Sequence, residues 1–212
     1  MHKLLKKDHF GEILSISDVD GRSILRDASC ASRGVGPVAR WLLGREARAL
    51  AALGKLDAVP RLLDRQARSL RRSYVDGDVM YRIRPQDPAY FKLAAKLLRG
   101  MHRLGVVHND LAKEANWLVS PEGTPALIDF QLAWYRPARG RLFRILARED
   151  LRHLLKHKRT YCPASLTRRE MDILDKPALI SRIWMATGKK LYLLITRGIL
   201  RWEERDGAEE RQ

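Results

Sequence analysis

The chain has 212 residues, of which 45% are hydrophobic, and it carries a formal net charge of +16. This length predicts one domain, or one domain built of two small lobes, and the apolar content excludes a disordered chain. The excess of Lys and Arg indicates an acidic partner: a nucleotide, a nucleic acid or an anionic membrane.

Two further features bear on the cellular compartment. No apolar run reaches the length of a transmembrane helix, and Met1 to Ser17 contains no stretch of signal-peptide length. The two cysteines, Cys30 and Cys162, are far apart in sequence and predict neither a disulfide framework nor a zinc site. These observations predict a cytoplasmic protein, with peripheral association at the inner membrane as the alternative.

The first elements in chain order predict a β-hairpin. Apolar residues alternate between Phe10 and Val19 and lead to Asp20-Gly21, which is a strong turn signal. Ser23 to Arg26 predicts the second strand, and residues 28–36 predict a loop.

A helix is expected next, from Pro37 to Leu53. Pro37 suits the first turn and Gly54 suits the end of such a helix. The apolar residues that follow helical spacing are Trp41, Leu42, Ala49, Leu50 and Leu53.

The later elements change from strands to helices. Ser69 to Tyr74 and Val79 to Ile83 predict two short strands, and Pro88 to Leu104 predicts a helix. Ala126 to Phe130 predicts a brief strand, and the pattern is helical from about Gly140 onward. A β-rich first part followed by a helical second part predicts an α+β fold with segregated halves.

Polar residues with chemical potential lie in the middle of the chain. His108-Asn109-Asp110-Leu111 is followed by Asn116 and then by Ile128-Asp129-Phe130-Gln131. The two aspartates supply carboxylate oxygens and Asn116 supplies an amide oxygen. Such ligands suit Mg²⁺, which takes the rest of its shell from water and phosphate. One aspartate could instead accept a hydroxyl proton, so the set indicates phosphoryl transfer.

In type and order these residues resemble the catalytic loop and the metal loop of the protein-kinase-like superfamily, in which H-R-D-L-x-x-x-N precedes D-F-G. The resemblance implies a two-lobed fold. Residues 1–84 would form a small N-lobe of β-sheet plus one helix, and residues 85–212 would form a shortened helical C-lobe. It also implies that ATP and Mg²⁺ bind between the lobes.

The same resemblance implies a role for each residue. Asp110 would orient or deprotonate the acceptor hydroxyl, and Asn116 and Asp129 would hold Mg²⁺. Lys113 would contact the γ-phosphate, and His108 would brace the loop.

The loops depart from the family pattern at three positions. Asn116 lies six residues after Asp110 instead of five, so the loop carries one extra residue. Gln131 replaces a glycine, and because Gln resists positive φ an inactivating flip of this loop is not expected. Asn109 replaces the arginine that reads a phosphorylated activation loop, so no such control is expected.

The residues expected to anchor the phosphates also depart from the family pattern. The family's lysine on the third strand is missing, and Arg26 takes its place. Glu46, 20 residues later in the predicted helix, is the natural partner of Arg26. The family's glycine-rich loop is also missing. Tyr74 lies in a segment that resembles the hinge, where the adenine edge meets backbone groups.

The second half is short for the superfamily and resembles that of the RIO kinases and the lipopolysaccharide-core sugar kinases. Glu149 to Lys156 predicts the start of a buried helix. Asp150 in this helix would brace the catalytic loop, as an aspartate of the family does. The alternative is a carboxylate that stabilises the helix dipole.

Residues 178–202 interleave basic residues with apolar and aromatic ones and contain no acid. Such a stretch can lie on an anionic membrane surface, or it can pack its apolar side onto the C-lobe. RNA is a further candidate for the basic charge and is less favoured, because no RNA-binding motif is evident.

Taken together, the residues predict a Mg²⁺-dependent phosphoryl transfer, and the resemblance implies an ATP-dependent phosphotransferase of the atypical serine/threonine protein kinase type. The alternative acceptor is a lipopolysaccharide-core sugar at the inner face of the membrane. The rival class is a pseudokinase that serves as a binding or scaffold module. Arg26 in place of lysine, the missing glycine-rich loop and the shifted Asn116 favour that rival.

Overall fold

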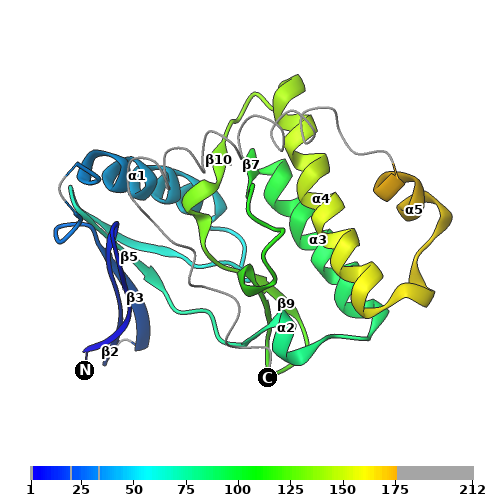
Figure 1. Ribbon diagram of the computed structural model, residues 1–212, viewed down its shortest axis with the longest axis horizontal. Coiled ribbons are helices and arrows are strands. Elements are labelled where there is room, and N and C mark those ends of the chain that lie inside the picture. Colours follow the sequence, from blue (N-terminus) through cyan, green and yellow to red (C-terminus); the bar gives the residue numbers. More distant parts are fainter. Residues whose placement is uncertain (1, 20, 33, 176–212) are drawn as a thin grey trace.

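The computed structural model describes residues 2–19, 21–32 and 34–175. Figure 1 shows a β-sheet and helix α1 on one side of the molecule and helices α3, α4 and α5 on the other. The predicted basic stretch 178–202 lies outside the described residues, as does Asp20 of the predicted turn. Within the described ranges, no helix is both long and apolar enough to cross a bilayer.

A five-stranded antiparallel sheet forms the first part, in the order β1-β2-β3-β5-β4. The predicted hairpin is confirmed as β2 and β3. Two other strands were not predicted: β1 is exposed almost throughout and lacks an apolar alternation, and β4 is only four residues long. The strands are β1 (His2–Asp8), β2 (Gly11–Asp18), β3 (Gly21–Asp27), β4 (Leu62–Arg65) and β5 (Ser69–Ser73).

Helix α1 (Gly36–Leu53) confirms the predicted helix and packs against β4 and β5. Its buried face includes Leu43, Glu46 and Leu50. Trp41 also follows the helical spacing but does not share this face, since it is 54% exposed. It lies one helical turn from Arg45, whose guanidinium stacks over the Trp41 ring at 4.7 Å.

A connector, residues 74–77, joins the sheet to the second part. It leads into β6 (Asp78–Val79), which pairs with β8 (Trp117–Val119). Gly77 has a φ of +138°, and a Cβ there would lie only 2.7 Å from the carbonyl oxygen of Val119. The connector therefore needs glycine where it passes β8.

The predicted strand from Val79 to Ile83 is wrong beyond its first residue. Met80 begins the single-turn helix α2 (Met80–Ile83) and is fully buried. The turn ends at Arg84, which has a φ of +52° and whose backbone N–H donates to the carbonyl of Met80 at 2.8 Å. The free energy gained by burying the Met80 side chain therefore outweighs the local preference of this segment for a strand.

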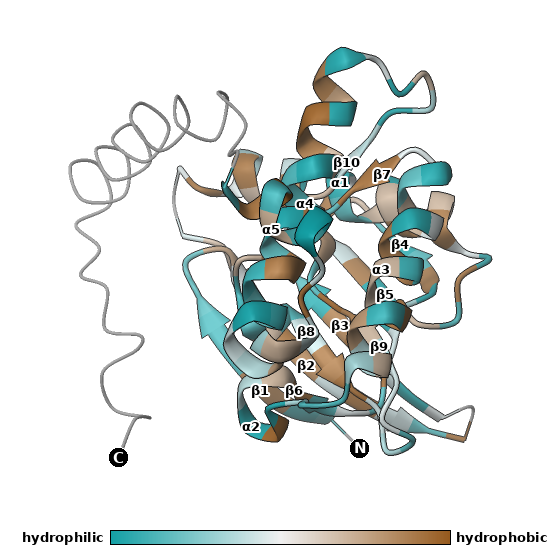
Figure 2. Cartoon of the chain, turned by 90° about the vertical axis from the view of Figure 1, so that its right-hand side faces the viewer, coloured by the Kyte–Doolittle hydropathy of each residue, from teal (hydrophilic) through white to brown (hydrophobic). Residues whose placement is uncertain are grey.

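The second part is helical, as predicted. Asp87 caps α3 (Pro88–Arg103) by accepting a hydrogen bond from the Ala89 N–H at 2.8 Å. Hydrophobic and hydrophilic segments alternate along the helices in Figure 2, as expected for elements with one buried face. The remaining elements are β7 (Val106–Val107), η1 (Glu114–Asn116), β9 (Pro125–Leu127), η2 (Phe130–Leu132), β10 (Trp134–Tyr135), α4 (Arg141–Tyr161), η3 (Pro163–Ser165) and α5 (Arg168–Asp175).

Two further boundaries differ from the predictions. The strand expected from Ala126 to Phe130 ends at Leu127, because Phe130 turns into the core as part of η2. The helix expected to start near Glu149 begins earlier, at Arg141. Residues around Glu149 therefore lie within the helix, where a carboxylate cannot compensate the N-terminal dipole.

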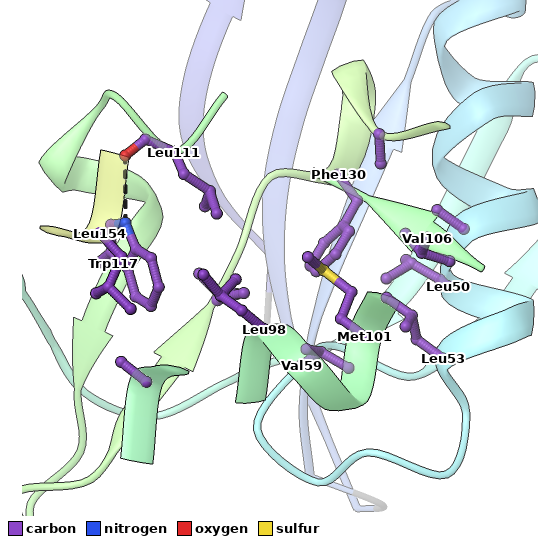
Figure 3. Close-up of a cluster of buried hydrophobic side chains, with 14 of the residues drawn as sticks. Leu50, Leu53, Val59, Leu98, Met101, Val106, Leu111, Trp117, Phe130 and Leu154 are labelled. Atoms are coloured by element: carbon purple, nitrogen blue, oxygen red, sulfur yellow. Dashed lines mark hydrogen bonds between the residues drawn. The ribbon is translucent and has the colours of Figure 1, made fainter. Parts of the chain in front are cut away.

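One hydrophobic core runs through both parts of the molecule. It joins Leu50 and Leu53 of α1 to Met101 of α3 and to Leu111 and Phe130, and Figure 3 shows these side chains. Leu111 directly follows Asp110, and Phe130 directly follows Asp129; both are fully buried. Burying such a side chain stabilises a fold by about 1.5–3 kcal/mol. The core therefore fixes the loops that carry the polar residues.

Candidate active site

The loop 108–116 follows buried strand β7 and is held by one carboxylate from helix α4. Asp150 is almost fully buried. It accepts hydrogen bonds from the backbone N–H of His108 at 2.8 Å and of Asn109 at 3.0 Å. The imidazole Nε2 of His102 lies 3.1 Å from the same carboxylate. Asp150 thus braces the loop, the first of the two roles considered from the sequence.

His108 connects this loop to the loop that carries Asp129. Its Nε2–H donates to the carbonyl of Ile128 at 3.0 Å, and its ring lies against Phe130 with 4.7 Å between centroids. The imidazole is fully buried. These contacts join the 108–116 loop to Ile128 and Phe130, on either side of Asp129.

The loop brings together Asp110, Lys113 and Asn116. The Asn116 amide nitrogen donates to the Asp110 carbonyl at 2.8 Å and to its Oδ2 at 3.1 Å. The ammonium group of Lys113 lies 2.9 Å from the same Oδ2. Despite the extra residue in the loop, Asn116 therefore reaches Asp110. Because its amide nitrogen faces Asp110, the group that Asn116 can offer a cation is its amide oxygen.

Asp129 lies at the start of the neighbouring loop in a strained conformation. Its φ is +64°, in the left-handed region that residues with a Cβ seldom adopt. Its Oδ1 is buried and has no hydrogen-bond partner. The residue before it, Ile128, donates its N–H to the Asn116 carbonyl at 3.1 Å, which ties the two loops together.

These features fit a bound cation. A buried carboxylate oxygen without a partner is costly unless a ligand satisfies it. In the part of the chain that the structure describes, no group of three or more His, Cys, Asp or Glu side chains could hold a metal ion alone. A cation held by Asp129 and Asn116 would therefore need water or phosphate oxygens as further ligands, which is the coordination that Mg²⁺ prefers.

The segment after Asp129 is clamped by an arginine that the sequence did not indicate. Arg45 of α1 donates from Nε to the Ala133 carbonyl at 3.1 Å and from Nη2 to the Leu132 carbonyl at 2.8 Å. The Asn109 amide donates to the same Leu132 carbonyl at 3.0 Å. Burial lowers the pKa of the Arg45 guanidinium. These bonds tie the segment after Asp129 to helix α1 and to Asn109.

The base of the 108–116 loop is also fixed from helix α4. His157 donates from Nε2 to the Leu111 carbonyl at 2.8 Å, and burial lowers the pKa of its imidazole. The Tyr161 hydroxyl donates to Glu114 at 2.7 Å, and desolvation with this bond raises its pKa to about 12. Trp117 adds a bond from Nε1 to the Leu111 carbonyl, drawn in Figure 3.

Arg26 and Glu46 meet on the sheet side of the molecule, as predicted. Both are buried, and Arg26 Nη1 lies 3.6 Å from Glu46 Oε2. A second arginine, Arg72 of β5, donates from Nη1 to Glu46 Oε1 at 2.8 Å. Sequence reasoning missed Arg72, because only the strand register places it opposite β3.

Tyr74, expected at the hinge, lies in the connector. Its backbone N–H donates to the Arg22 carbonyl at 3.1 Å, and the Arg22 guanidinium lies 4.0 Å above its ring. A cavity of about 530 Å³ opens beside the connector, but Asp110, Asp129 and Arg26 do not line it. Its lining comes from residues 57–59, 61, 73–76, 120–122 and 124–126.

Comparison with known proteins identifies the fold. No protein-family model matches the chain, and no curated protein matches its sequence. The structure is similar to the crystal structure of the Rio2 kinase from Chaetomium thermophilum, with a TM-score of 0.60 and 16% identity over 94% of this chain and 71% of that chain. It is also similar to the Rio2 kinase-ADP/Mg²⁺-phosphoaspartate complex from the same organism, with a TM-score of 0.53 and 18% identity over 95% and 69%. The chain therefore has the expected α+β, protein-kinase-like fold, with an antiparallel sheet in its first part and helices in its second.

Proposed function

We propose that the chain is a phosphotransferase that uses ATP and Mg²⁺ and transfers the γ-phosphate to a hydroxyl group. The observation that carries the proposal is the buried, unpartnered Oδ1 of Asp129, in a loop that a backbone bond ties to Asn116. The second Rio2 structure, a complex with ADP and Mg²⁺, supports the same nucleotide and cation here.

Each residue of the site has a proposed task. Asp129 and the amide oxygen of Asn116 hold Mg²⁺, which neutralises phosphate charge. Asp110 orients the acceptor hydroxyl and takes its proton. Lys113, at 2.9 Å from Asp110, pairs with the transferring phosphate when ligand is bound. His108 holds the two loops in register.

The nucleotide is proposed to lie between residues 1–84 and 85–212, acting as the N-lobe and the C-lobe. Arg26 pairs with its phosphates from the sheet side. The connector at Tyr74 meets the adenine edge through backbone groups. Arginine serves here because it is always charged and donates several N–H groups.

For the acceptor we favour a protein serine or threonine and a cytoplasmic location. A lipopolysaccharide-core sugar at the inner membrane face is the alternative, supported by the basic composition of residues 178–202. That stretch would bring the protein to an anionic membrane surface. RNA as a partner is less favoured.

A pseudokinase is the second candidate function. The observation that favours it is Arg26, which stands where the superfamily has lysine and lies near Glu46. Against it, a scaffold has no chemical use for an unpartnered buried oxygen at Asp129 beside Asn116 and Asp110.

Transfer of label from γ-labelled ATP with Mg²⁺ into fractionated lysate tests the proposal, with Asp110→Asn run in parallel. Label in a protein band that the variant loses supports a protein kinase. Label in the lipopolysaccharide fraction supports the sugar kinase. No label above the variant in any fraction contradicts phosphotransfer and favours the pseudokinase.

A further inference from the structure

Arg72 reaches the inner face of the sheet because of the strand register. On β5 it lies opposite Ile24, and Leu70 lies opposite Arg26. Directly opposed residues of antiparallel strands project from the same face. Arg72 therefore shares the α1 side of the sheet with Arg26. The next residue back, Arg71, projects from the other face, where it donates to Ser23 at 2.9 Å and pairs with Asp18.

Arg72 and Arg26 share one carboxylate, but not equally. Arg72 hydrogen-bonds Glu46 Oε1 at 2.8 Å, whereas Arg26 lies 3.6 Å from Oε2, beyond hydrogen-bond distance. Glu46 Oε2 is buried without a hydrogen-bond partner. The closer contact of Glu46 is therefore with Arg72, and Arg26 is its loosely held second partner.

Arg26, Arg72 and Glu46 form a cluster in which two positive charges face one negative charge. The side chains of Arg26, Arg72 and Glu46 are 10%, 12% and 1% exposed. Among the described residues, Glu46 is the one carboxylate in ion-pair contact with either arginine. A buried charge without a counter-charge is costly, so the cluster can accept an anion.

We propose that Arg72 is a positioning residue that holds Glu46 and so leaves the Arg26 guanidinium available to a nucleotide phosphate. This inference rests on the proposed ATP-binding function. In the described residues no side-chain hydrogen bond uses Arg26, although a guanidinium has five N–H donors. Without Arg72, Arg26 would be left as the sole cationic partner of Glu46, and Glu46 would then compete with the phosphate for Arg26.

The rival account gives Arg72 a packing role only. In that case its loss would reduce stability and would weaken Mg-ATP and adenosine alike. The proposed role instead concerns phosphate alone. Comparing Mg-ATP with adenosine separates the two accounts, because adenosine presents the same base and sugar without the phosphates.

The experiment measures dissociation constants of Mg-ATP and adenosine for wild type, Arg72→Met, Arg72→Lys and the control Arg71→Met. Arg72→Met is expected to weaken Mg-ATP by about tenfold, the scale of one hydrogen bond to a charged group, and to leave adenosine unchanged. Arg72→Lys should recover most of the loss, since it restores a cation for Glu46. Arg71→Met should bind both ligands like wild type.

A double variant, Arg72→Met with Glu46→Gln, gives a second readout. The neutral amide that Glu46→Gln introduces cannot hold Arg26 by charge, so Mg-ATP affinity should rise again relative to Arg72→Met.

Equal weakening of Mg-ATP and adenosine in Arg72→Met, which leaves the ratio of the two dissociation constants unchanged, would overturn the role of Arg72 alone. Wild type that binds neither ligand would overturn the proposed function and this inference with it. Should Arg72→Met fail to fold, Arg72→Gln with the same two ligands decides the question.

Discussion

The loop that carries Asp110 is held by buried side chains bonded to its backbone, whereas the Arg26 side chain on the sheet makes, among the described residues, one ion pair at 3.6 Å. Asp150 and His157 fix the loop before any ligand binds. Arg26, in contrast, keeps its donors free of hydrogen bonds to the described side chains. Under the proposed function, this difference would divide the tasks: the loops would supply fixed geometry for the reacting groups, and the sheet would supply an adjustable cation for phosphate.

The largest effect is expected for a substitution of Asp110, and it would test the role proposed for the loop. Asp110→Asn preserves the shape of the side chain but removes its ability to take a proton. We expect turnover to fall by roughly a hundred- to ten-thousandfold while the dissociation constant of Mg-ATP stays near that of wild type. Initial rates and calorimetric titration measure the two quantities separately.

The exposed Asp172 offers a matched control for this variant. Asp172→Asn should leave both turnover and nucleotide affinity unchanged. Residual turnover close to wild type in Asp110→Asn would show that Asp110 is not the group that receives the proton.

The next effect concerns the support of the loop. Asp150→Ala removes the acceptor of two backbone N–H groups and leaves them without this partner, the buried N–H of His108 and the part-buried N–H of Asn109. The free energy of unfolding should fall by about 3 kcal/mol, as measured by urea denaturation. In the exposed control Asp64→Ala, the change should stay within about 0.5 kcal/mol. A loss for Asp150→Ala no larger than for this control would remove the proposed basis for rigidity of the loop.

The smallest effect concerns pH. Burial lowers the pKa of His157 in the folded protein, so the unfolded chain binds the proton more tightly. Below the ordinary histidine value of about 6.5, stability should therefore fall as the pH falls towards the folded pKa, and above it this contribution is constant.

His157→Gln tests this contribution, because Gln can still donate to the Leu111 carbonyl but does not titrate. Urea denaturation between about pH 5 and pH 8 should show a shallower loss of stability at low pH for His157→Gln than for wild type. Exposed His2→Gln should follow wild type. Parallel curves for all three proteins would show that His157 does not titrate with unfolding.

The sequence predicted the loop side of the site better than the sheet side for a physical reason. The residues from His108 to Gln131 lie close together in the chain, so their order and spacing carry the information. Arg45 bonds to residues 87 and 88 positions away, and Arg72 reaches Glu46 only through strand register. Such contacts leave no local pattern.

Local sequence pattern also leaves details of the fold open. Trp41 follows the helical spacing of α1, but the buried face of that helix runs through Leu43, Glu46 and Leu50, and Trp41 is exposed. Met80 lies in an apolar run typical of a strand, yet its burial is achieved by a helical turn. In both cases tertiary packing decides between alternatives that the local pattern leaves open.

Mg²⁺ dependence of ATP binding tests the central claim most directly. Calorimetric titration of ATP into wild type and Asp129→Asn, each with Mg²⁺ and with EDTA, separates the cation site from the rest of the nucleotide site. The account predicts that wild type binds ATP more tightly with Mg²⁺ than with EDTA, and that Asp129→Asn loses this difference while retaining its binding in EDTA. ATP binding that is indifferent to Mg²⁺ in wild type, or an equal Mg²⁺ effect in both proteins, would contradict it.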